Sequence, residues 1–324
     1  MEFPFFFFSG DNLDGNADNA PSLLSVCIMW FLAILIVLTN IPVFIVTPRL
    51  KDLSEATKIT MISLGITDFL IGVLYVCKLG YFTAVGQYAI EDDYLCLIDG
   101  LSFCTVFAVS LTTITFLCTD RVITIKYPLQ YPIYFTQKFV ICVNIGIWLC
   151  STALTNLGHF VLGMEIAFSK YSYACAPLQK YRDKTALIAI TLGFAMPTCV
   201  IFTCAVVMYH VVHQQILQIR DVENSAAASQ MGSLVSHKKC IRTIFCMVGG
   251  YYICWIPYLI FVLIWGYVYG HSVSSTAEGI TSWMAISNSM FNSLIYLPTV
   301  KEYREIFKNI FIPKICLSET GQNG

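Results

Sequence analysis

Seven long apolar runs divide the chain, and short polar segments separate them. A helix rises ~1.5 Å per residue, so about 20 apolar residues cross the ~30 Å hydrocarbon core of a bilayer. Because the connections are short, neighbouring helices are expected to run antiparallel in one bundle. The runs predict membrane spans at residues 22–47, 56–81, 94–125, 137–161, 185–217, 239–267 and 275–298.

The composition is that of a membrane protein. Hydrophobic residues make up 57% of the 324 residues and charged residues only 12%, whereas a soluble domain carries about 25% charge. The net charge of -1 argues against nucleic acid as a partner. The opening MEFPFFFFSG lacks the basic region of a cleavable signal peptide, so residues 1–21 are expected to form a tail outside the bilayer.

Lysine and arginine are distributed unevenly between the two sides of the predicted bundle. Fourteen of the nineteen follow the first, third, fifth or seventh span, four lie on the opposite side, and Lys78 lies inside a span. Because positive charge accumulates on the cytoplasmic side, the N-terminus is predicted outside and the C-terminus inside the cell.

Cysteine usage agrees with this orientation. Of the 14 cysteines, only Cys96 and Cys175 fall in segments predicted to face the oxidising exterior. A disulfide between them would tie the head of the third span to the loop after the fourth. Two free thiols are the alternative.

Polar side chains interrupt three of the spans. Asp68 lies in the second span and Ser110 in the third, while Asn288, Asn292 and Tyr296 share one face of the seventh. Such groups satisfy their hydrogen bonds only by facing the bundle interior. A carboxylate among hydroxyls and amides suits a hard cation such as Na⁺. A protonated Asp68 hydrogen-bonded to Asn292, with no ion, accounts for the same pattern.

Two spans contain a proline. Pro257, in the run CWIPY of the sixth span, removes an intrahelical hydrogen bond and predicts a hinge next to the bulky Trp255. Pro197 should loosen the fifth span in the same way. Prolines are also merely tolerated in membrane helices, but two in neighbouring spans favour movement.

Taken together, these features resemble the rhodopsin-like (class A) G protein-coupled receptors over nearly the whole chain. Each motif alone is weak, but the ordered set is specific, and Cys96 precedes Arg121 by the 25 residues that the family requires. The motifs, one per helix, are Asn40, the run LGITD ending in Asp68, Cys96, the pair Asp120 and Arg121, Trp148, Pro197, the run CWIP and the run NSLIY.

The resemblance implies an all-α membrane protein, a seven-transmembrane helix bundle with a short amphipathic eighth helix. In that family Asp120 would restrain Arg121, and the freed arginine would meet a heterotrimeric G protein. Trp255 matches the switch tryptophan below the ligand. Asp68, Ser110, Asn288, Ser289 and Asn292 match an allosteric sodium pocket, and Pro128, Leu129 and Tyr296 match coupling positions.

The resemblance also assigns the end of the chain. Tyr303 and Phe307 match the eighth helix, which lies along the membrane and meets anionic lipid, and Cys316 after it is a candidate lipidation site. The chain then divides into an extracellular tail at 1–21, a receptor domain at 22–298, and a cytoplasmic helix and tail at 299–324. The implied partners are an extracellular ligand, a G protein, arrestin and membrane lipids, with no obligatory cofactor and with Na⁺ as a candidate allosteric ion.

Four positions depart from the family pattern. Val122 replaces an aromatic residue after Arg121, and Ser293 stands where the family usually has proline. Ala205 occupies a position that commonly holds tyrosine. His237 replaces an acidic residue that some members pair with the motif arginine, and a neutral histidine would raise basal activity because it cannot form that ion pair.

The ligand cavity is expected at the outer ends of the second, third, sixth and seventh spans. Phe103 stands where amine receptors carry an aspartate, which argues against an ordinary aminergic pocket, and no lysine occurs in 275–298 to bind retinal. The resemblance implies that Lys78 and Asp99 lie near each other, as a pair that a zwitterionic or charged ligand opens. The alternative is that Lys78 reaches the membrane interface and the pair is structural. Further cavity residues are Phe107, Trp255, Tyr258, Tyr75, Tyr81 and Glu278.

A receptor for a small polar molecule or short peptide is therefore the predicted function. The alternative is an ion-coupled transporter or channel that uses the stripe of Asp68, Asn288 and Asn292, although no inverted repeat is visible. A metal-dependent membrane hydrolase is weaker still, because His210 and His213 have no third ligand nearby in the sequence.

Overall fold

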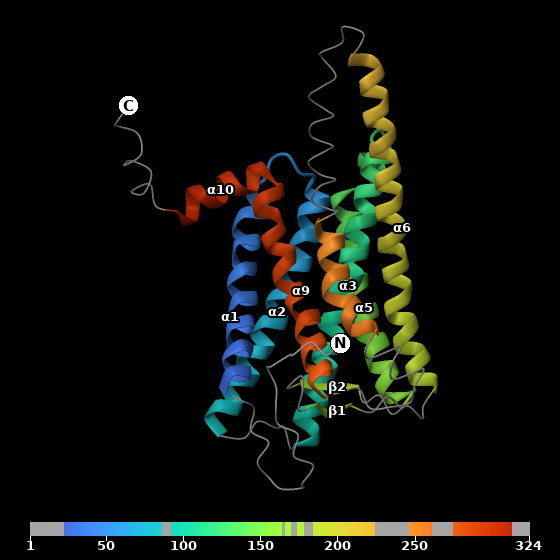
Figure 1. Ribbon diagram of the computed structural model, residues 1–324. Helices are drawn as coiled ribbons and strands as arrows, with labels where there is room; N and C mark the ends of the chain where they lie inside the picture. The colour runs from blue at the N-terminus through green and yellow to red at the C-terminus, as the bar shows by residue number, and fades with distance from the viewer. Residues whose placement is uncertain are drawn as a thin grey trace, which may run out of the picture.

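A computed structural model describes residues 23–85, 92–163, 166–169, 174–177, 184–223, 246–260 and 275–312. Long helices run side by side along a common axis (Figure 1), which confirms the predicted all-α bundle. A further helix at 246–258, unlabelled in Figure 1, continues as a π turn at 259–260, directly after Pro257. The labelled long helices are α1 (Leu23–Val46), α2 (Glu55–Val85), α3 (Asp93–Lys126), α5 (Gln137–Phe160), α6 (Lys184–Glu223) and α9 (Ser275–Thr299).

The helix ends agree closely with the apolar runs. Within the described residues, five helices are long and apolar enough to cross a membrane: α1, α2, α3, α5 and part of α6. α2 continues past residue 81 to Val85, and α6 continues past residue 217 to Glu223. The predicted limits of the sixth span, 239 and 267, and the tail at 1–21 lie outside the described residues.

Short elements join the long helices. A 3-10 turn, η1 (Thr47–Arg49), follows α1, and a short helix, α4 (Tyr131–Tyr134), follows α3. Strands β1 (Ile166–Ser169) and β2 (Ala174–Pro177) form an antiparallel hairpin in which Phe168 faces Cys175. The hydrophobic pattern predicted neither α4 nor the hairpin, because elements of four residues are too short to show a period.

The predicted eighth helix is present as α10 (Lys301–Phe311). The chain leaves α9 through Val300, whose extended backbone (φ -106°, ψ 106°) separates the two helices. α10 then runs sideways from the end of α9, across the direction of the long helices and past the end of α1 (Figure 1), with Tyr303 buried and with Lys301 and Lys308 exposed. Below, the two ends of the bundle are called the hairpin end, near β1 and β2, and the α10 end.

α3 occupies the centre of the bundle. It contacts α2, α5 and α6 and also both strands of the hairpin. Asp92 caps its N-terminus by accepting a 2.8 Å hydrogen bond from the backbone N–H of Leu95. The hairpin packs closely enough to require glycine at position 100, since an added Cβ would lie 2.4 Å from Cγ2 of Ile166.

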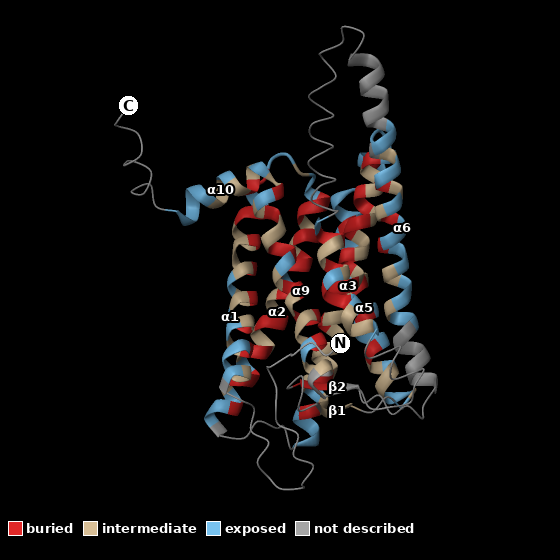
Figure 2. Cartoon of the chain, in the orientation of Figure 1, coloured by how far each residue is buried: buried red, intermediate tan, exposed pale blue. Residues whose placement is uncertain are grey.

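Buried and exposed positions are divided between the inner and outer faces of the helices. Figure 2 shows buried residues concentrated where the helices face one another. Large apolar side chains such as Leu149, Leu154, Met196 and Ile253 are exposed on the outside. An outer surface of this kind suits lipid rather than water.

Candidate functional site

Asp68 lies at the centre of a buried polar cluster formed by α2, α3 and α9. Its side chain is 0% exposed. Ser110 donates to Oδ1 at 3.3 Å, and Nδ2 of Asn292 donates to Oδ2 at 3.0 Å. Ser289 also reaches this carboxyl group. The structure therefore brings together four of the five residues that match the sodium pocket.

The fifth residue, Asn288, contributes a buried amide oxygen. Its Oδ1 is buried and has no hydrogen-bond partner among the described residues. One carboxylate with hydroxyl and amide oxygens is a donor set that suits a hard monovalent cation. Elsewhere in the described chain, no group of three or more His, Cys, Asp or Glu side chains could hold a metal, so the His210 and His213 pair gains no support.

Asn40 connects the polar cluster to α1. Its Nδ2 donates to the carbonyl oxygens of Ile36 at 2.8 Å and Ser289 at 3.1 Å. Its Oδ1 accepts a hydrogen bond from the hydroxyl of Ser293 at 2.5 Å. The sequence identified Asn40 and Ser293 separately, but nothing in their spacing indicated that they are partners.

Lys78 and Asp99 form an ion pair near the hairpin end. Nζ of Lys78 lies 2.8 Å from Oδ2 of Asp99, and the two side chains are only 4% and 13% exposed. The same ammonium lies 4.7 Å from the ring centroid of Tyr75 and 5.9 Å from that of Phe103. Oδ2 of Asp99 also accepts a 3.1 Å hydrogen bond from the backbone N–H of Cys175.

The disulfide predicted between Cys96 and Cys175 is confirmed. It joins α3 to β2 with a Cα–Cα distance of 5.4 Å. Because Cys175 also donates its N–H to Asp99, the hairpin is fastened to α3 by one covalent bond and one hydrogen bond, three residues apart along the helix.

A column of aromatic rings continues from the ion pair into the bundle. Successive ring centroids are 5.8 Å apart for Phe103 and Phe107 and 4.3 Å apart for Phe107 and Trp255. Tyr258 contacts Trp255 from the same helix at 5.7 Å. Glu278 lies in α9, but its side chain is outside the described part of the structure.

Two aromatic residues that sequence reasoning missed pack beside this column. Trp283 of α9 lies 5.3 Å from Tyr75, and Phe194 of α6 lies 5.5 Å from Trp255, both measured between centroids. Each belongs to an apolar helix, where an aromatic side chain gives no signal of its own. The hydroxyl of Tyr75 is buried and lacks a hydrogen-bond partner within the described residues.

The helix at 246–260 is joined to α6 beside Pro197. The hydroxyl of Tyr251 lies 2.9 Å from Oγ1 of Thr198, and the hydroxyl of Tyr252 donates to the carbonyl oxygen of Thr198 at 2.8 Å. Two adjacent tyrosines therefore bind the residue that directly follows the proline of α6. This link holds the helix of Trp255 against a point where α6 has lost a backbone donor.

At the α10 end, Asp120 accepts hydrogen bonds from two neighbouring elements. The hydroxyl of Tyr131 donates to Oδ1 at 2.6 Å, and that of Thr57 donates to Oδ2 at 3.2 Å. The guanidinium of Arg121 lies 3.3 Å from Oδ2. Ser54 adds a hydroxyl 3.2 Å from that of Tyr131. These five residues are called the Asp120 network below.

Burial changes the chemistry of the tyrosine in this network. Burial, followed by the nearby Asp120 carboxylate, raises the pKa of the Tyr131 phenol above its ordinary value. The phenol therefore stays protonated at physiological pH and remains a hydrogen-bond donor. The sequence did not identify Tyr131, because its role depends on the loop folding back onto α3.

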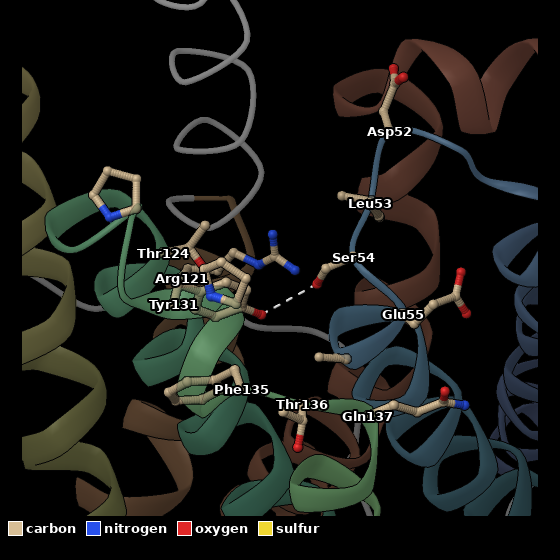
Figure 3. A pocket seen from close by; sticks show the side chains of 13 residues that line it. Asp52, Leu53, Ser54, Glu55, Arg121, Thr124, Tyr131, Phe135, Thr136 and Gln137 are labelled. Atoms are coloured by element: carbon tan, nitrogen blue, oxygen red, sulfur yellow. Dashed lines mark hydrogen bonds between the residues drawn. The ribbon is translucent and has the colours of Figure 1, made fainter.

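The Asp120 network borders a cavity of about 570 Å³. Figure 3 shows the Asp52–Glu55 segment on one side of it, Tyr131 and Phe135 on the other, Thr136 and Gln137 along the bottom, and the Arg121 side chain between the two sides. Pro128 also lines the cavity, and the neighbouring Leu129 is 87% exposed. Tyr127, Ile133 and Tyr134 of the same loop are exposed as well, and a group of exposed apolar side chains beside a cavity is typical of a protein-binding surface.

Tyr303 and Glu302 help to fix α10 to the bundle. The ring of Tyr303 is buried 5.7 Å from that of Tyr296 in α9, and burial raises the pKa of Tyr303. The carboxylate of Glu302 accepts hydrogen bonds from the backbone N–H groups of Lys51 at 2.7 Å and Asp52 at 3.1 Å. Cys316 lies outside the described residues.

The remaining departures from the family pattern are partly located by the structure. Val122 and Ala205 are partly buried and pack against the main hydrophobic core near the α10 end. His237 falls outside the described residues, so the predicted loss of its ion pair has no structural counterpart here.

The fold and these sites define a seven-helix membrane receptor, and comparison with known proteins agrees. The sequence model of the family described as 7 transmembrane receptor (rhodopsin family) matches residues 39–296. The chain therefore belongs to this family, and it is a multi-pass protein of the plasma membrane.

The sequence identity to individual receptors of this family is low. The chain is 23% identical to the histamine H2 receptor of Homo sapiens over 298 residues, which cover 88% of this chain and 79% of that receptor. It is 27% identical to trace amine-associated receptor 8b of Rattus norvegicus over 307 residues, covering 90% and 87% of the two chains. For somatostatin receptor type 4 of Rattus norvegicus the identity is 23% over 299 residues, covering 91% and 74%. Neither the family nor these relatives support the transporter alternative.

Proposed function

We propose that the chain binds an extracellular ligand at the hairpin end and activates a heterotrimeric G protein at the α10 end. The observation that carries this proposal is the Asp120 network, in which Asp120 holds Arg121 beside a cavity next to an exposed apolar loop. A buried charged pair contributes little net stability, so its presence here favours a role in switching or binding.

The proposed orientation follows from the lysines and arginines. Most of them follow the first, third, fifth or seventh span, on the same side of the bundle as α10. The hairpin end then faces the exterior and the α10 end the cytoplasm. Residues 1–21 form an extracellular tail, 22–298 the receptor domain, and 299–324 the cytoplasmic helix and tail.

The ligand is proposed to be small and polar, zwitterionic or charged, or else the end of a short peptide. Asp99 is already bonded to Lys78 and to the hairpin backbone, so a simple ammonium group would have to displace Lys78 from it. Phe103 provides no charge one turn further in. The relatives are named for histamine, a trace amine and somatostatin, and so do not single out one ligand class.

Transmission is proposed to follow the aromatic column. A ligand that separates Lys78 from Asp99 also moves Phe103, whose ring contacts Phe107, which contacts Trp255. Trp255 lies two residues before Pro257, so its displacement would swing the other end of that helix outward. The ligand shifts an existing two-state equilibrium, and the freed Arg121 meets the G protein together with Pro128, Leu129 and Tyr296.

Na⁺ is proposed as an allosteric ligand of the inactive state. Asp68, Ser110, Ser289 and the unpartnered oxygen of Asn288 would hold it, with Asn292 orienting the carboxylate. The purified receptor is then expected to melt at a higher temperature in NaCl than in choline chloride. Asp68→Asn should abolish that difference; a difference that survives in this variant would exclude the site.

Further partners are proposed at the cytoplasmic face. Lys301, Arg304 and Lys308 of α10 are proposed to meet anionic lipid headgroups, because they lie on one short amphipathic helix, and Cys316 is the proposed lipidation site. Arrestin is a second candidate partner for the surface that binds the G protein.

The function is tested by measuring nucleotide exchange on a panel of Gα subunits in cells that express the chain, while a library of small polar molecules and short peptides is applied. Stimulated exchange that is lost in Arg121→Ala at equal surface expression is the expected result. Ion flux that persists in Arg121→Ala and disappears in Asp68→Asn would overturn the proposal in favour of a transporter.

The ligand site is tested with the most active compound from that library. Lys78→Met and Asp99→Asn are each expected to lower its potency, and the double variant should lose little more than the worse single variant, because the two side chains act as one pair. Losses that simply add would contradict a shared role for the pair.

A further inference from the structure

α9 has its proline five residues nearer the α10 end than the family pattern predicts. Ser293 stands where the family usually has proline, and Pro298 lies inside the helix instead. Five residues correspond to ~7.5 Å along a helix. The point at which α9 lacks a backbone donor is therefore in its last turn rather than beside Asn292.

Ser293 joins α9 to α1 through its side chain. Its hydroxyl donates to Oδ1 of Asn40 at 2.5 Å, and Nδ2 of Asn40 returns a 3.1 Å hydrogen bond to the carbonyl oxygen of Ser289, one turn earlier in α9. All three residues are buried. A proline at 293 could make neither the hydroxyl bond nor the helical N–H bond, whereas serine makes both available.

Asn292 and Ser293 join α9 to two neighbouring helices by side-chain hydrogen bonds. Asn292 donates to Asp68 of α2 at 3.0 Å, so consecutive residues of α9 bind α2 and α1. After them, Pro298 leaves the carbonyl group of Leu294 without a helical donor. α9 ends one residue later at Thr299, and Val300 turns the chain into α10.

We propose that Ser293 is a positioning residue that fastens α9 to α1, and that α9 yields at Pro298 rather than at 293. Movement at this end of the helix is then confined to the last turn of α9 and to α10. The proposed function gives this movement its purpose, but the fastening itself is a property of the unliganded receptor.

Hydrogen exchange of the purified receptor in detergent micelles, followed by mass spectrometry, tests the proposal without ligand or G protein. In the natural chain, slow exchange is expected to extend through residue 297 and to become fast beyond Pro298. Ser293→Ala should accelerate exchange of the amides at 293–297 about fivefold, the factor for one hydrogen bond of ordinary strength. Ser293→Thr retains the hydroxyl and should exchange like the natural chain.

A second variant covers the case in which Ser293→Ala does not fold. Pro298→Ala restores the missing donor and is expected to slow exchange at 299–302 without changing residues 289–293. A boundary between slow and fast exchange at 289–293 in the natural chain would overturn the proposal. So would equal exchange in the Ala and Thr variants at position 293.

The same variants separate this inference from the proposed function. With the G protein that couples to the natural receptor, Ser293→Ala should change basal nucleotide exchange and Ser293→Thr should not. If no variant couples to any G protein but the exchange pattern holds, the proposed function fails and the fastening stands. If coupling is normal but the exchange pattern is absent, only the fastening fails.

Discussion

Removing the hydroxyl of Tyr131 tests the Asp120 network most directly. Tyr131→Phe deletes the 2.6 Å hydrogen bond to Oδ1 of Asp120 and leaves the contacts of Asp120 with Thr57 and Arg121 in place. Phenylalanine also keeps the stacking of this ring on Phe135, whose centroid is 4.9 Å away. The change therefore removes this bond and the 3.2 Å contact of the same hydroxyl with Ser54, and leaves the rest of the network in place.

The expected effect follows from the charge and burial of the two partners. A hydrogen bond to a charged group contributes about 1.5–3 kcal/mol, and here Asp120 is 1% exposed and Tyr131 7% exposed, so water weakens it little. If the bond forms only in the inactive state, losing it raises the ratio of active to inactive receptor about 10- to 150-fold, since ~1.4 kcal/mol is a factor of ten.

The assay is basal nucleotide exchange on the coupled G protein, in membranes with equal amounts of receptor. Tyr134→Phe is the matched control, because Tyr134 lies in the same short helix but is 68% exposed. Basal exchange that is equal in Tyr131→Phe and Tyr134→Phe would refute the role of the Asp120 network in restraining Arg121.

Three further predictions concern stability. The pKa of the Tyr131 phenol is raised in the folded protein. The contribution of this phenol to the free energy of unfolding should therefore be constant up to the ordinary tyrosine pKa of about 10, and it should be lost as pH rises through the higher folded value. Between about pH 7 and pH 11 the melting temperature of Tyr131→Phe should fall less than that of the natural chain. Gly100→Ala, which places a Cβ 2.4 Å from Ile166, should cost about 1–3 kcal/mol of stability, whereas Gly146→Ala, with nothing within 4 Å, should not lower the melting temperature. Glu302→Gln should lower the melting temperature because a neutral amide binds the N–H groups of Lys51 and Asp52 more weakly; Glu305→Gln is the control, and equal melting of the two variants would contradict this contact.

The bundle, the disulfide and the family could be predicted from the sequence because each leaves a one-dimensional signal. Apolar runs of membrane length identify the helices, and only two cysteines lie on the oxidising side. Lys78 and Asp99 were paired from the helix arrangement that the family resemblance implies, and the structure has them 2.8 Å apart.

The partners of individual polar groups could not be predicted. Tyr131 reaches Asp120 only because α4 folds back onto α3, and no periodicity describes a helix of four residues. Ser293 was recognised only as a missing proline, since the sequence does not show that Asn40 of α1 is opposite it. Trp283 and Phe194 have no special pattern within helices that are apolar throughout.

The shared oxygen of Asp99 has a consequence for kinetics. Oδ2 serves both the Lys78 side chain and the backbone of the hairpin that the disulfide holds over the bundle. A ligand group that competes for this oxygen would weaken the attachment of the hairpin as it binds. The rates of ligand binding and of ligand dissociation would therefore depend on the same atom. Compounds that bind Lys78 and leave Asp99 bonded to Cys175 should therefore dissociate more slowly than compounds of equal affinity that bind Asp99 itself.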